Sequence, residues 1–418
     1  MEKRETRNSR ALLIGASCAQ SAVYNSDAAS FRELASLVET AGGAVFATLL
    51  QNRQSPDPAT YIGEGKVEEA RALIAANEID LVVFDGELSP SQLQNLETAL
   101  DCFVIDRSML ILDIFALHAV TSEGKLQVEL AQLKYTLPRL TGRGAELSRL
   151  GAGIGTRGPG ESKLEIDRRH IRARIAALRK ELDVVKKNRA QQRKSRDQSG
   201  CPRVGIIGYT NAGKSTLLNT LTGAGVLSLD KLFATLDPTT RKLTLEGGFE
   251  MLLTDTVGFI RNLPHHLIEA FSSTLDEVRY SDLLLQVVDV SNPEFAAQME
   301  VVEKLVAELG GGAIPMVVAL NKADLVSTSD LPYTRDAVAI SARDGTGLDQ
   351  LLQRCYEKLT EGMHRMTVRI PYDKGGLLER IHSAAQVSSE EYGADGILVT
   401  LTADDALYGQ LRPYSISE

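Results

Sequence analysis

The sequence predicts a multidomain α/β protein. Its 418 residues exceed one ordinary domain. Short apolar runs alternate with helical stretches before residue 110 and again after residue 201. A glycine-rich G-x-x-x-x-G-K-S loop joins one such run to a helix. We expect an N-terminal α/β subdomain, a long antiparallel helical hairpin, a P-loop domain and a small C-terminal α/β unit, with the boundaries 1–110, 111–200, 201–362 and 363–418.

The N-terminal subdomain should hold a largely parallel sheet, because its apolar runs are separated by helices long enough for crossovers. The expected strands are 11–16, 44–50, 81–85 and 102–106. The expected helices are 31–41, 67–76 and 90–100.

Two apolar seams with nearly heptad spacing predict the hairpin. The first consists of Leu126, Leu130, Leu133 and Leu137, and the second of Leu164, Ile171, Ile175, Leu178, Leu182 and Val185. The glycine-rich segment 151–160 between them is expected to be a loop. We expect the polar run 186–200 to be the frayed end of the second helix and a linker.

After the linker, strands are expected at 203–207, 242–245, 251–254, 283–289, 316–320 and 337–340. The C-terminal unit should contain two strands, 367–370 and 396–401, around one helix, 376–385.

The phosphate-binding loop has the context that its motif requires, since it follows an apolar strand and precedes a helical segment. Its residues are Gly208, Tyr209, Thr210, Asn211, Ala212, Gly213, Lys214 and Ser215. Backbone N–H groups and the helix N-terminus suit phosphates. Lys214 should reach the β- and γ-phosphates, and the Ser215 hydroxyl should bind Mg²⁺ as the cofactor.

A D-x-x-G motif follows the third strand of this domain. It consists of Asp255, Thr256, Val257 and Gly258. Asp255 should hold Mg²⁺ directly or through water, and the Gly258 N–H should meet the γ-phosphate.

An N-K-x-D motif identifies the base as guanine, so GTP and GDP are the expected ligands. It consists of Asn321, Lys322, Ala323 and Asp324. The Asp324 carboxylate can accept hydrogen bonds from guanine N1–H and N2, whereas adenine would leave it buried and unpaired. After the next strand, Ser341, Ala342 and Arg343 can bring the Ala342 N–H to guanine O6.

A threonine that binds Mg²⁺ together with Ser215 should lie between the phosphate loop and Asp255. The segment 233–240 offers three, of which Thr235 is our choice, with Thr239 or Thr240 second. Phe233, Ala234, Leu236 and Asp237 are expected beside the nucleotide. The expected catalytic groups are therefore Lys214, Thr235 and Gly258.

The residue after the D-x-x-G motif is Phe259, where many GTPases carry a glutamine that orients the attacking water. A phenyl ring cannot position water. We therefore expect hydrolysis that is slow in the isolated protein and faster when a partner orders the surrounding loops.

Charge and composition limit the partners. The net charge of −9 disfavours a general nucleic-acid binder, and no DNA partner is expected. Residues 161–200 nevertheless carry 13 Lys+Arg against 6 Asp+Glu, a local balance of +7 (13 − 6). No apolar run is long enough for an integral membrane segment, and the four dispersed cysteines predict reduced thiols.

Long stretches of the chain resemble the HflX family of bacterial GTPases. The stretch 123–135, EGKLQVELAQLKY, is the most specific of them, since other GTPases do not share this helical motif. The remaining matches are 61–66, 104–107, 112–116, 138–140, 153–161 and 233–241. The resemblance implies a partner in the 50S ribosomal subunit and its 23S rRNA, and splitting of 70S ribosomes under stress.

The hairpin fits this implication, because a Gly/Arg-rich tip can approach rRNA closely. The arginines expected to contact rRNA are Arg139, Arg143, Arg149 and Arg157. Two alternatives stay open: a large-subunit assembly GTPase, and an RNA-remodelling nucleotidase with N-terminal ATP use. The expected state is a monomer that is cytoplasmic and ribosome-associated, with peripheral membrane association as an alternative location.

Overall fold

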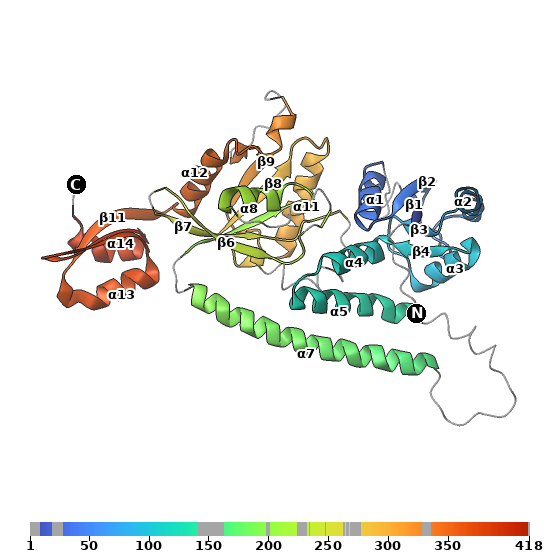
Figure 1. Ribbon diagram of the computed structural model, residues 1–418, viewed down its shortest axis with the longest axis horizontal. Helices are drawn as coiled ribbons and strands as arrows, with labels where there is room; N and C mark the ends of the chain where they lie inside the picture. Colours follow the sequence, from blue (N-terminus) through green and yellow to red (C-terminus); the bar gives the residue numbers. More distant parts are fainter. Residues whose placement is uncertain are drawn as a thin grey trace. The chain divides into compact units, whose positions relative to one another are not determined.

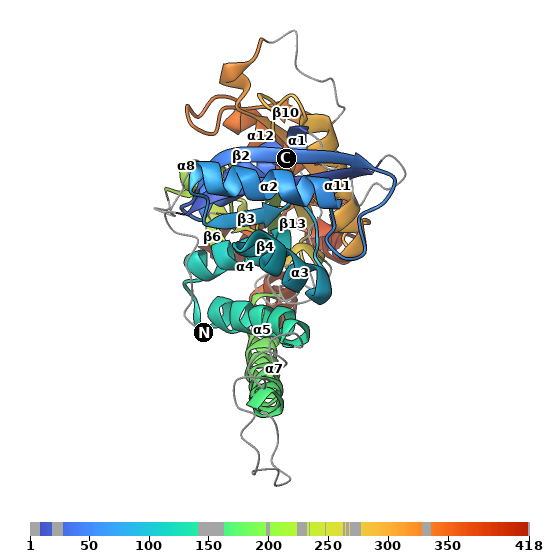
Figure 2. The same cartoon turned by 90° about the vertical axis from the view of Figure 1, so that its right-hand side faces the viewer.

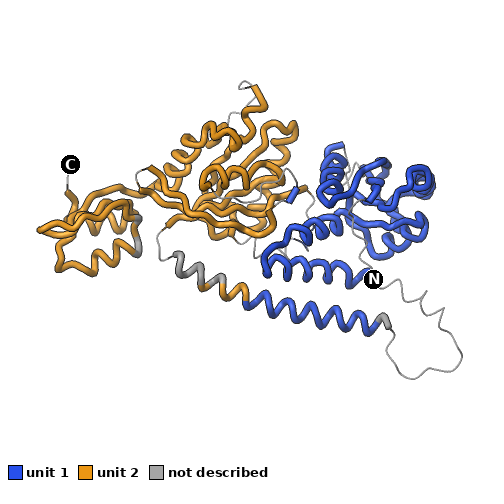
Figure 3. Tube along the Cα trace, in the orientation of Figure 1, with its two compact units in different colours: residues 1–184, 231–233, 262–271 blue, residues 185–230, 234–261, 272–418 orange. Residues whose placement is uncertain are grey.

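The computed structural model describes residues 9–18, 28–140, 163–197, 201–223, 232–233, 235–246, 248–261, 264, 267, 277–327 and 336–416. The chain divides into two compact units, which Figure 3 distinguishes by colour. Unit 1 comprises residues 1–184 and two short segments from the second half of the chain, 231–233 and 262–271. Unit 2 comprises the rest. The multidomain α/β class that the sequence predicts is confirmed.

Unit 1 contains a four-stranded parallel sheet in the order β2-β1-β3-β4, as expected from its alternating pattern. The strands are β1 (Arg10–Cys18), β2 (Ala44–Arg53), β3 (Leu81–Phe84) and β4 (Phe103–Asp106). Alternate side chains of β1 enter the two faces of the sheet, so both faces need helices to cover them.

Two helices cover each face of this sheet (Figure 1). On one side, α2 (Glu64–Asn77) and α3 (Pro90–Leu100) form an apolar core with the sheet. On the other, α1 (Ala28–Thr40) and α4 (Arg107–His118) contact each other and the strands. Helix α3 begins at its expected residue, because Ser89 and Gln92 form a capping box before the apolar repeat.

The hairpin pairs α5 (Ser122–Arg139) with α7 (Lys163–Asp197), which run side by side in opposite directions (Figures 1 and 2). The predicted seams meet in one apolar cluster, with Leu130 packed among Ile175, Leu178 and Leu182. The prediction of a frayed end from residue 186 was wrong, because α7 continues to Asp197. Polarity alone does not end a helix when no proline or glycine interrupts it.

Unit 2 contains a six-stranded sheet in the order β10-β9-β8-β5-β7-β6, in which only β6 is antiparallel to its neighbour. The strands are β5 (Arg203–Gly208), β6 (Thr239–Thr244), β7 (Glu250–Asp255), β8 (Leu283–Asp289), β9 (Met316–Asn321) and β10 (Ala337–Ala339). The central position of β5 puts the loop that follows it at the carboxyl edge of the sheet, beside the ends of β7 and β8.

Three helices bury the faces of this sheet. The helices α8 (Lys214–Thr222) and α12 (Leu348–Leu359) share one apolar core with the strands. Helix α11 (Phe295–Glu308) packs Phe295 and Met299 into a second cluster with β8 and β9. The sheet is therefore rigidly covered, and its carboxyl edge is left to the loops.

The C-terminal part of unit 2 differs from its prediction. It contains a three-stranded antiparallel sheet in the order β11-β13-β12, with two helices. The elements are β11 (Met363–Ile370), α13 (Gly375–Ala384), β12 (Gln386–Gly393), β13 (Gly396–Asp404) and α14 (Asp405–Leu411). The two predicted strands and the predicted helix are present as β11, β13 and α13. The prediction missed β12, a polar edge strand without an apolar run, and α14, a short helix.

Candidate nucleotide-binding site

The phosphate loop connects β5 to α8 through two glycines that no other residue could replace without displacement. Gly208 has φ of 151°, and a Cβ there would lie 2.3 Å from the Val287 carbonyl oxygen. Gly213 has φ of 96°, and a Cβ there would lie 2.2 Å from Asn321 Nδ2. The chain therefore turns tightly, and the N-terminus of α8 faces the carboxyl edge of the sheet.

Lys214, the first residue of α8, is buried inside this loop. Its Nζ donates to the Tyr209 carbonyl at 2.7 Å and to the Gly208 carbonyl at 3.3 Å. Burial lowers the pKa of the Lys214 amine to about 8, against the opposing attraction of the Asp255 carboxylate. An anionic group in the loop would stabilise the charged amine that burial disfavours.

Three oxygen-bearing side chains meet beside Lys214. Ser215 Oγ donates to Asp255 Oδ2 at 2.6 Å and lies 2.8 Å from Thr235 Oγ1. Burial raises the pKa of Asp255, although Lys214 and the hydroxyls counteract it. Asp255 Oδ1 is buried and has no hydrogen-bond partner among the described residues. An unpaired carboxylate oxygen next to two hydroxyls is a donor set that suits Mg²⁺.

The other two threonine candidates lie elsewhere. Thr239 and Thr240 belong to β6, opposite Asp255 and Thr254 of β7. The Thr240 hydroxyl lies 2.9 Å from the Thr254 hydroxyl. Of the three threonines, Thr235 is therefore the one beside Ser215.

The D-x-x-G segment runs alongside the phosphate loop. The Phe259 N–H donates to the Gly208 carbonyl at 3.1 Å, and the Thr210 N–H donates to the Phe259 carbonyl at 2.8 Å. A Cβ on Gly258 would lie 3.0 Å from Lys214 Nζ. Gly258 and the lysine amine are thus next to each other, as the expected contact with one phosphate requires.

The guanine-recognition residues form a bridge between loops. Asn321 Nδ2 donates to the Ala212 carbonyl at 2.8 Å, and Asn321 Oδ1 accepts from the Ala342 N–H at 2.9 Å. The Ala342 N–H expected at guanine O6 is therefore engaged by Asn321 in this structure. Asp324 is exposed, so its carboxylate is accessible to a base.

Two polar residues that support these loops, Asp289 and Thr220, were not predicted. Asp289 ends β8, and its Oδ2 pairs with Lys322 Nζ at 2.6 Å. Thr220 Oγ1 donates to the Ala342 carbonyl at 2.7 Å. Neither belongs to a motif with a recognisable spacing, so the sequence offered no signal for them.

Comparison with known proteins decides the family. Four family models match in order: GTP-binding GTPase N-terminal over 28–116, GTP-binding GTPase Middle Region over 118–196, 50S ribosome-binding GTPase over 203–322, and HflX C-terminal domain over 329–407. The GTPase HflX of Lacrimispora saccharolytica is 51% identical over 388 residues, which is 91% of each chain. The chain belongs to the HflX family of GTPases. It is a GTP-binding protein and a hydrolase acting on GTP.

Other HflX relatives are almost as similar. The Escherichia coli GTPase HflX is 42% identical over 376 residues, covering 88% of each chain. Among solved structures, the SsGBP–GDP complex is 28% identical, with a TM-score of 0.47, and covers 85% of this chain and 99% of its own.

The structure also shows the surroundings of several other predicted contacts of this HflX GTPase. The Phe233 ring packs against Phe115 of α4, with centroids 4.8 Å apart and both residues in unit 1. The Leu236 side chain is buried, and Arg343 is exposed. Ala234 lies outside the described residues.

The predicted rRNA contact at Arg139 conflicts with its surroundings. Its Nη2 donates to the Leu88 carbonyl at 2.8 Å and pairs with Asp106 at 3.3 Å. Its guanidinium carbon lies 3.4 Å from the centre of the Tyr135 ring. These contacts make Arg139 a structural residue of unit 1. The other predicted contacts, Arg143, Arg149 and Arg157, lie outside the described residues.

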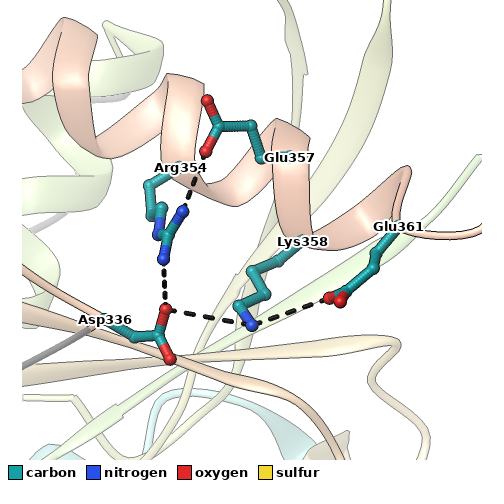
Figure 4. A pocket seen from close by; sticks show the side chains of 5 residues that line it. All are labelled: Asp336, Arg354, Glu357, Lys358 and Glu361. Carbon is teal, nitrogen blue, oxygen red and sulfur yellow. Dashed lines mark hydrogen bonds and ion pairs between the residues drawn. The ribbon is translucent and has the colours of Figure 1, made fainter.

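A concavity of about 440 Å³ lies between α12 and the residue before β10, away from the phosphate loop residues described above (Figure 4). Its charged side chains pair with one another: Arg354 with Asp336 and with Glu357 at 3.0 Å, and Lys358 with Asp336 at 3.8 Å and Glu361 at 3.6 Å. This mutual pairing stabilises the helix–strand contact rather than offering a charge to a ligand.

The residues that the structure describes offer neither a metal cluster nor a membrane-spanning helix. No group of three or more His, Cys, Asp or Glu side chains is placed to hold a metal ion there. No helix among those residues is long and apolar enough to cross a membrane.

Proposed function

We propose that this HflX GTPase binds GTP with Mg²⁺, associates with the 50S ribosomal subunit in that state, and splits 70S ribosomes under stress. Hydrolysis then releases it. The observation that carries the ribosomal part is the match of residues 203–322 to the model described as a 50S ribosome-binding GTPase.

In this proposal the nucleotide lies at the loop between β5 and α8. The amide groups at the N-terminus of α8 and the Lys214 amine bind the phosphates. The Gly258 N–H and Thr235 contact the end of the nucleotide that carries the γ-phosphate. The base lies against Asn321 and Lys322, where the exposed Asp324 carboxylate accepts from its N1–H and N2 groups.

The residues beside Lys214 fit a magnesium ion. Ser215 Oγ and Thr235 Oγ1 would hold it, with Asp255 acting directly or through a water. The ion supplies positive charge against the phosphate oxygens. Thr235 would bind only when a triphosphate and its ion are present, which makes the segment around it sensitive to hydrolysis.

The described surface of α7 supports an rRNA partner. Several of its basic side chains are exposed: Arg172, Arg179, Lys180, Lys186 and Lys187. A helix that projects such charges suits the phosphates of rRNA, where single charges add up to a salt-dependent affinity. The proposal also includes that the protein is a monomer and that it associates with ribosomes in the cytoplasm.

The test is sucrose-gradient sedimentation of 70S ribosomes with the full chain and GTP, a non-hydrolysable GTP analogue, or GDP. The analogue should convert 70S into subunits and leave the protein on 50S, whereas GDP should leave 70S intact. Bound protein with intact 70S in every state would favour a large-subunit assembly factor. No bound protein in any state would refute the ribosomal role.

A matched pair of variants tests the α7 surface. Arg172→Glu with Arg179→Glu should remove binding to 50S and leave GTP affinity unchanged. Arg365→Glu with Arg369→Glu, which reverses two exposed arginines of β11, is the control and should still bind. Equal loss in both variants would argue for non-specific charge attraction.

A further inference from the structure

The side chain of Thr210 has an unusual environment. Thr210 is the third residue of the phosphate loop and is only 6% exposed. Its Oγ1 is buried and has no hydrogen-bond partner among the described residues. A buried hydroxyl without a partner is unfavourable, so such an atom in a functional site calls for an explanation.

The neighbours of Thr210 are the groups proposed to contact the γ-phosphate. A Cβ on Gly258 would lie 2.8 Å from Thr210 Cγ2 and 3.0 Å from Lys214 Nζ. The Thr210 methyl, the Gly258 backbone and the lysine amine therefore converge on one point, and a rotation about the Cα–Cβ bond of Thr210 would bring its hydroxyl there. A phosphoryl group held by Gly258 and Lys214 would lie beside the Thr210 side chain.

The side chain at the usual water-orienting position is apolar. Phe259 stands at the position of the usual glutamine and is 1% exposed. Its backbone is fixed by hydrogen bonds to Gly208 and Thr210. Rotating this ring away would bring no polar atom to the site. A polar group for the attacking water must come from another element.

We propose that Thr210 is a catalytic residue of GTP hydrolysis. Its hydroxyl accepts a hydrogen bond from the attacking water and donates one to a γ-phosphate oxygen. One O–H donor and two lone pairs suffice for both bonds. The water oxygen bonds to the γ-phosphorus, the bond to the GDP leaving oxygen breaks, and the water proton passes to the phosphate product. This inference rests on the phosphate site proposed above.

Isosteric variants test the hydroxyl. Thr210→Val keeps the shape and loses the hydroxyl, whereas Thr210→Ser keeps the hydroxyl. In single-turnover hydrolysis, Thr210→Val should be slower by roughly 10- to 100-fold, the usual effect of losing one hydrogen bond to a charged group. Thr210→Ser should stay within about threefold of the parent. Affinity for GDP should stay within about threefold in both.

Two outcomes would overturn the role. One is Thr210→Val hydrolysing at the parent rate, and the other is Thr210→Ser becoming as slow as Thr210→Val. If Thr210→Val does not fold, the Thr210→Ser and Thr210→Ala pair makes the same comparison, with Thr210→Ala expected to be the slower of the two. The proposed phosphate site fails separately, if Lys214→Ala retains GDP affinity.

Discussion

Both units place carboxylates at the carboxyl edge of a parallel sheet, but the two edges are completed differently. In unit 1, Asp85 follows β3 and pairs with Arg107, and Asp106 ends β4 and pairs with Arg139. In unit 2, Asp255 ends β7, and one of its oxygens has no partner among the described residues. We call the edge in unit 1 closed, because its carboxylates are paired with arginines, and the edge in unit 2 open, because a carboxylate oxygen there has no partner among the described residues.

The pairing partners explain this difference. Arg107 begins α4 and is 2% exposed, so its charge lies permanently between Asp85 and Glu33. A guanidinium is always charged and satisfies carboxylates without any ligand. The lysine of unit 2 instead points into its own loop and has a pKa lowered by burial. Its hydrogen bonds go to backbone carbonyls, which leaves the charge of the amine for an anionic ligand.

The largest expected effect comes from removing an arginine that pairs with the carboxylates of the closed edge. Arg107→Met should lower the free energy of unfolding by about 3–5 kcal/mol, because the Asp85 and Glu33 carboxylates would lose the buried cation that lies between them. Urea denaturation of the full chain, followed through its first transition, measures this. GDP affinity should change by less than about twofold, since the site lies in the other unit.

The control for this variant is Arg174→Ala, which removes an exposed pair with Glu129 and should leave the transition nearly unchanged. If both variants unfold at the same urea concentration, the buried pair has no special importance.

The next effect concerns the exposed carboxylate of the open edge. Asp324→Asn should weaken GTP binding by roughly 10- to 100-fold, the usual value of hydrogen bonds to a charged acceptor. It should strengthen binding of xanthosine triphosphate, whose extra oxygen accepts from the new amide. Asp349→Asn, an exposed acid in the first turn of α12, is the matched control. Unchanged GTP affinity in Asp324→Asn would remove this residue from the site.

The residues of the open edge were predicted from the sequence more accurately than the residues that surround them. Each nucleotide motif restricts residue types at fixed spacing, so Ser215 and Asp255 could be predicted to lie close together before any coordinates. Thr220 and Asp289 belong to no such pattern, and only the fold brings them to their partners. The edge strand β12 was missed because few of its side chains are apolar, and the exposure of Asp324 depends on a loop conformation that spacing does not encode.

A smaller effect is a pH dependence that distinguishes the two edges. Because burial lowers the Lys214 pKa to about 8, GTP affinity should be full below pH 8 and fall about tenfold per unit above it. The stability of the protein measured without added nucleotide should change in the opposite direction. Between pH 8 and 10.5 the unfolded chain binds more protons at Lys214, so stability rises with pH.

Equilibrium binding of GTP and of guanosine across this range checks the prediction. Guanosine lacks phosphates, so any change in its affinity reports titration of the base and can be subtracted. A GTP affinity that, after this correction, is constant from pH 7 to 10 would mean that Lys214 does not contact the phosphates.

The contrast between the two edges is tested most directly by nucleotide stoichiometry, measured by equilibrium dialysis of the full chain with GTP and with ATP. The account predicts one GTP per chain, loss of that binding in Lys214→Ala, and no ATP binding. A second equivalent of nucleotide, or ATP binding that survives Lys214→Ala, would contradict it and place a ligand in unit 1.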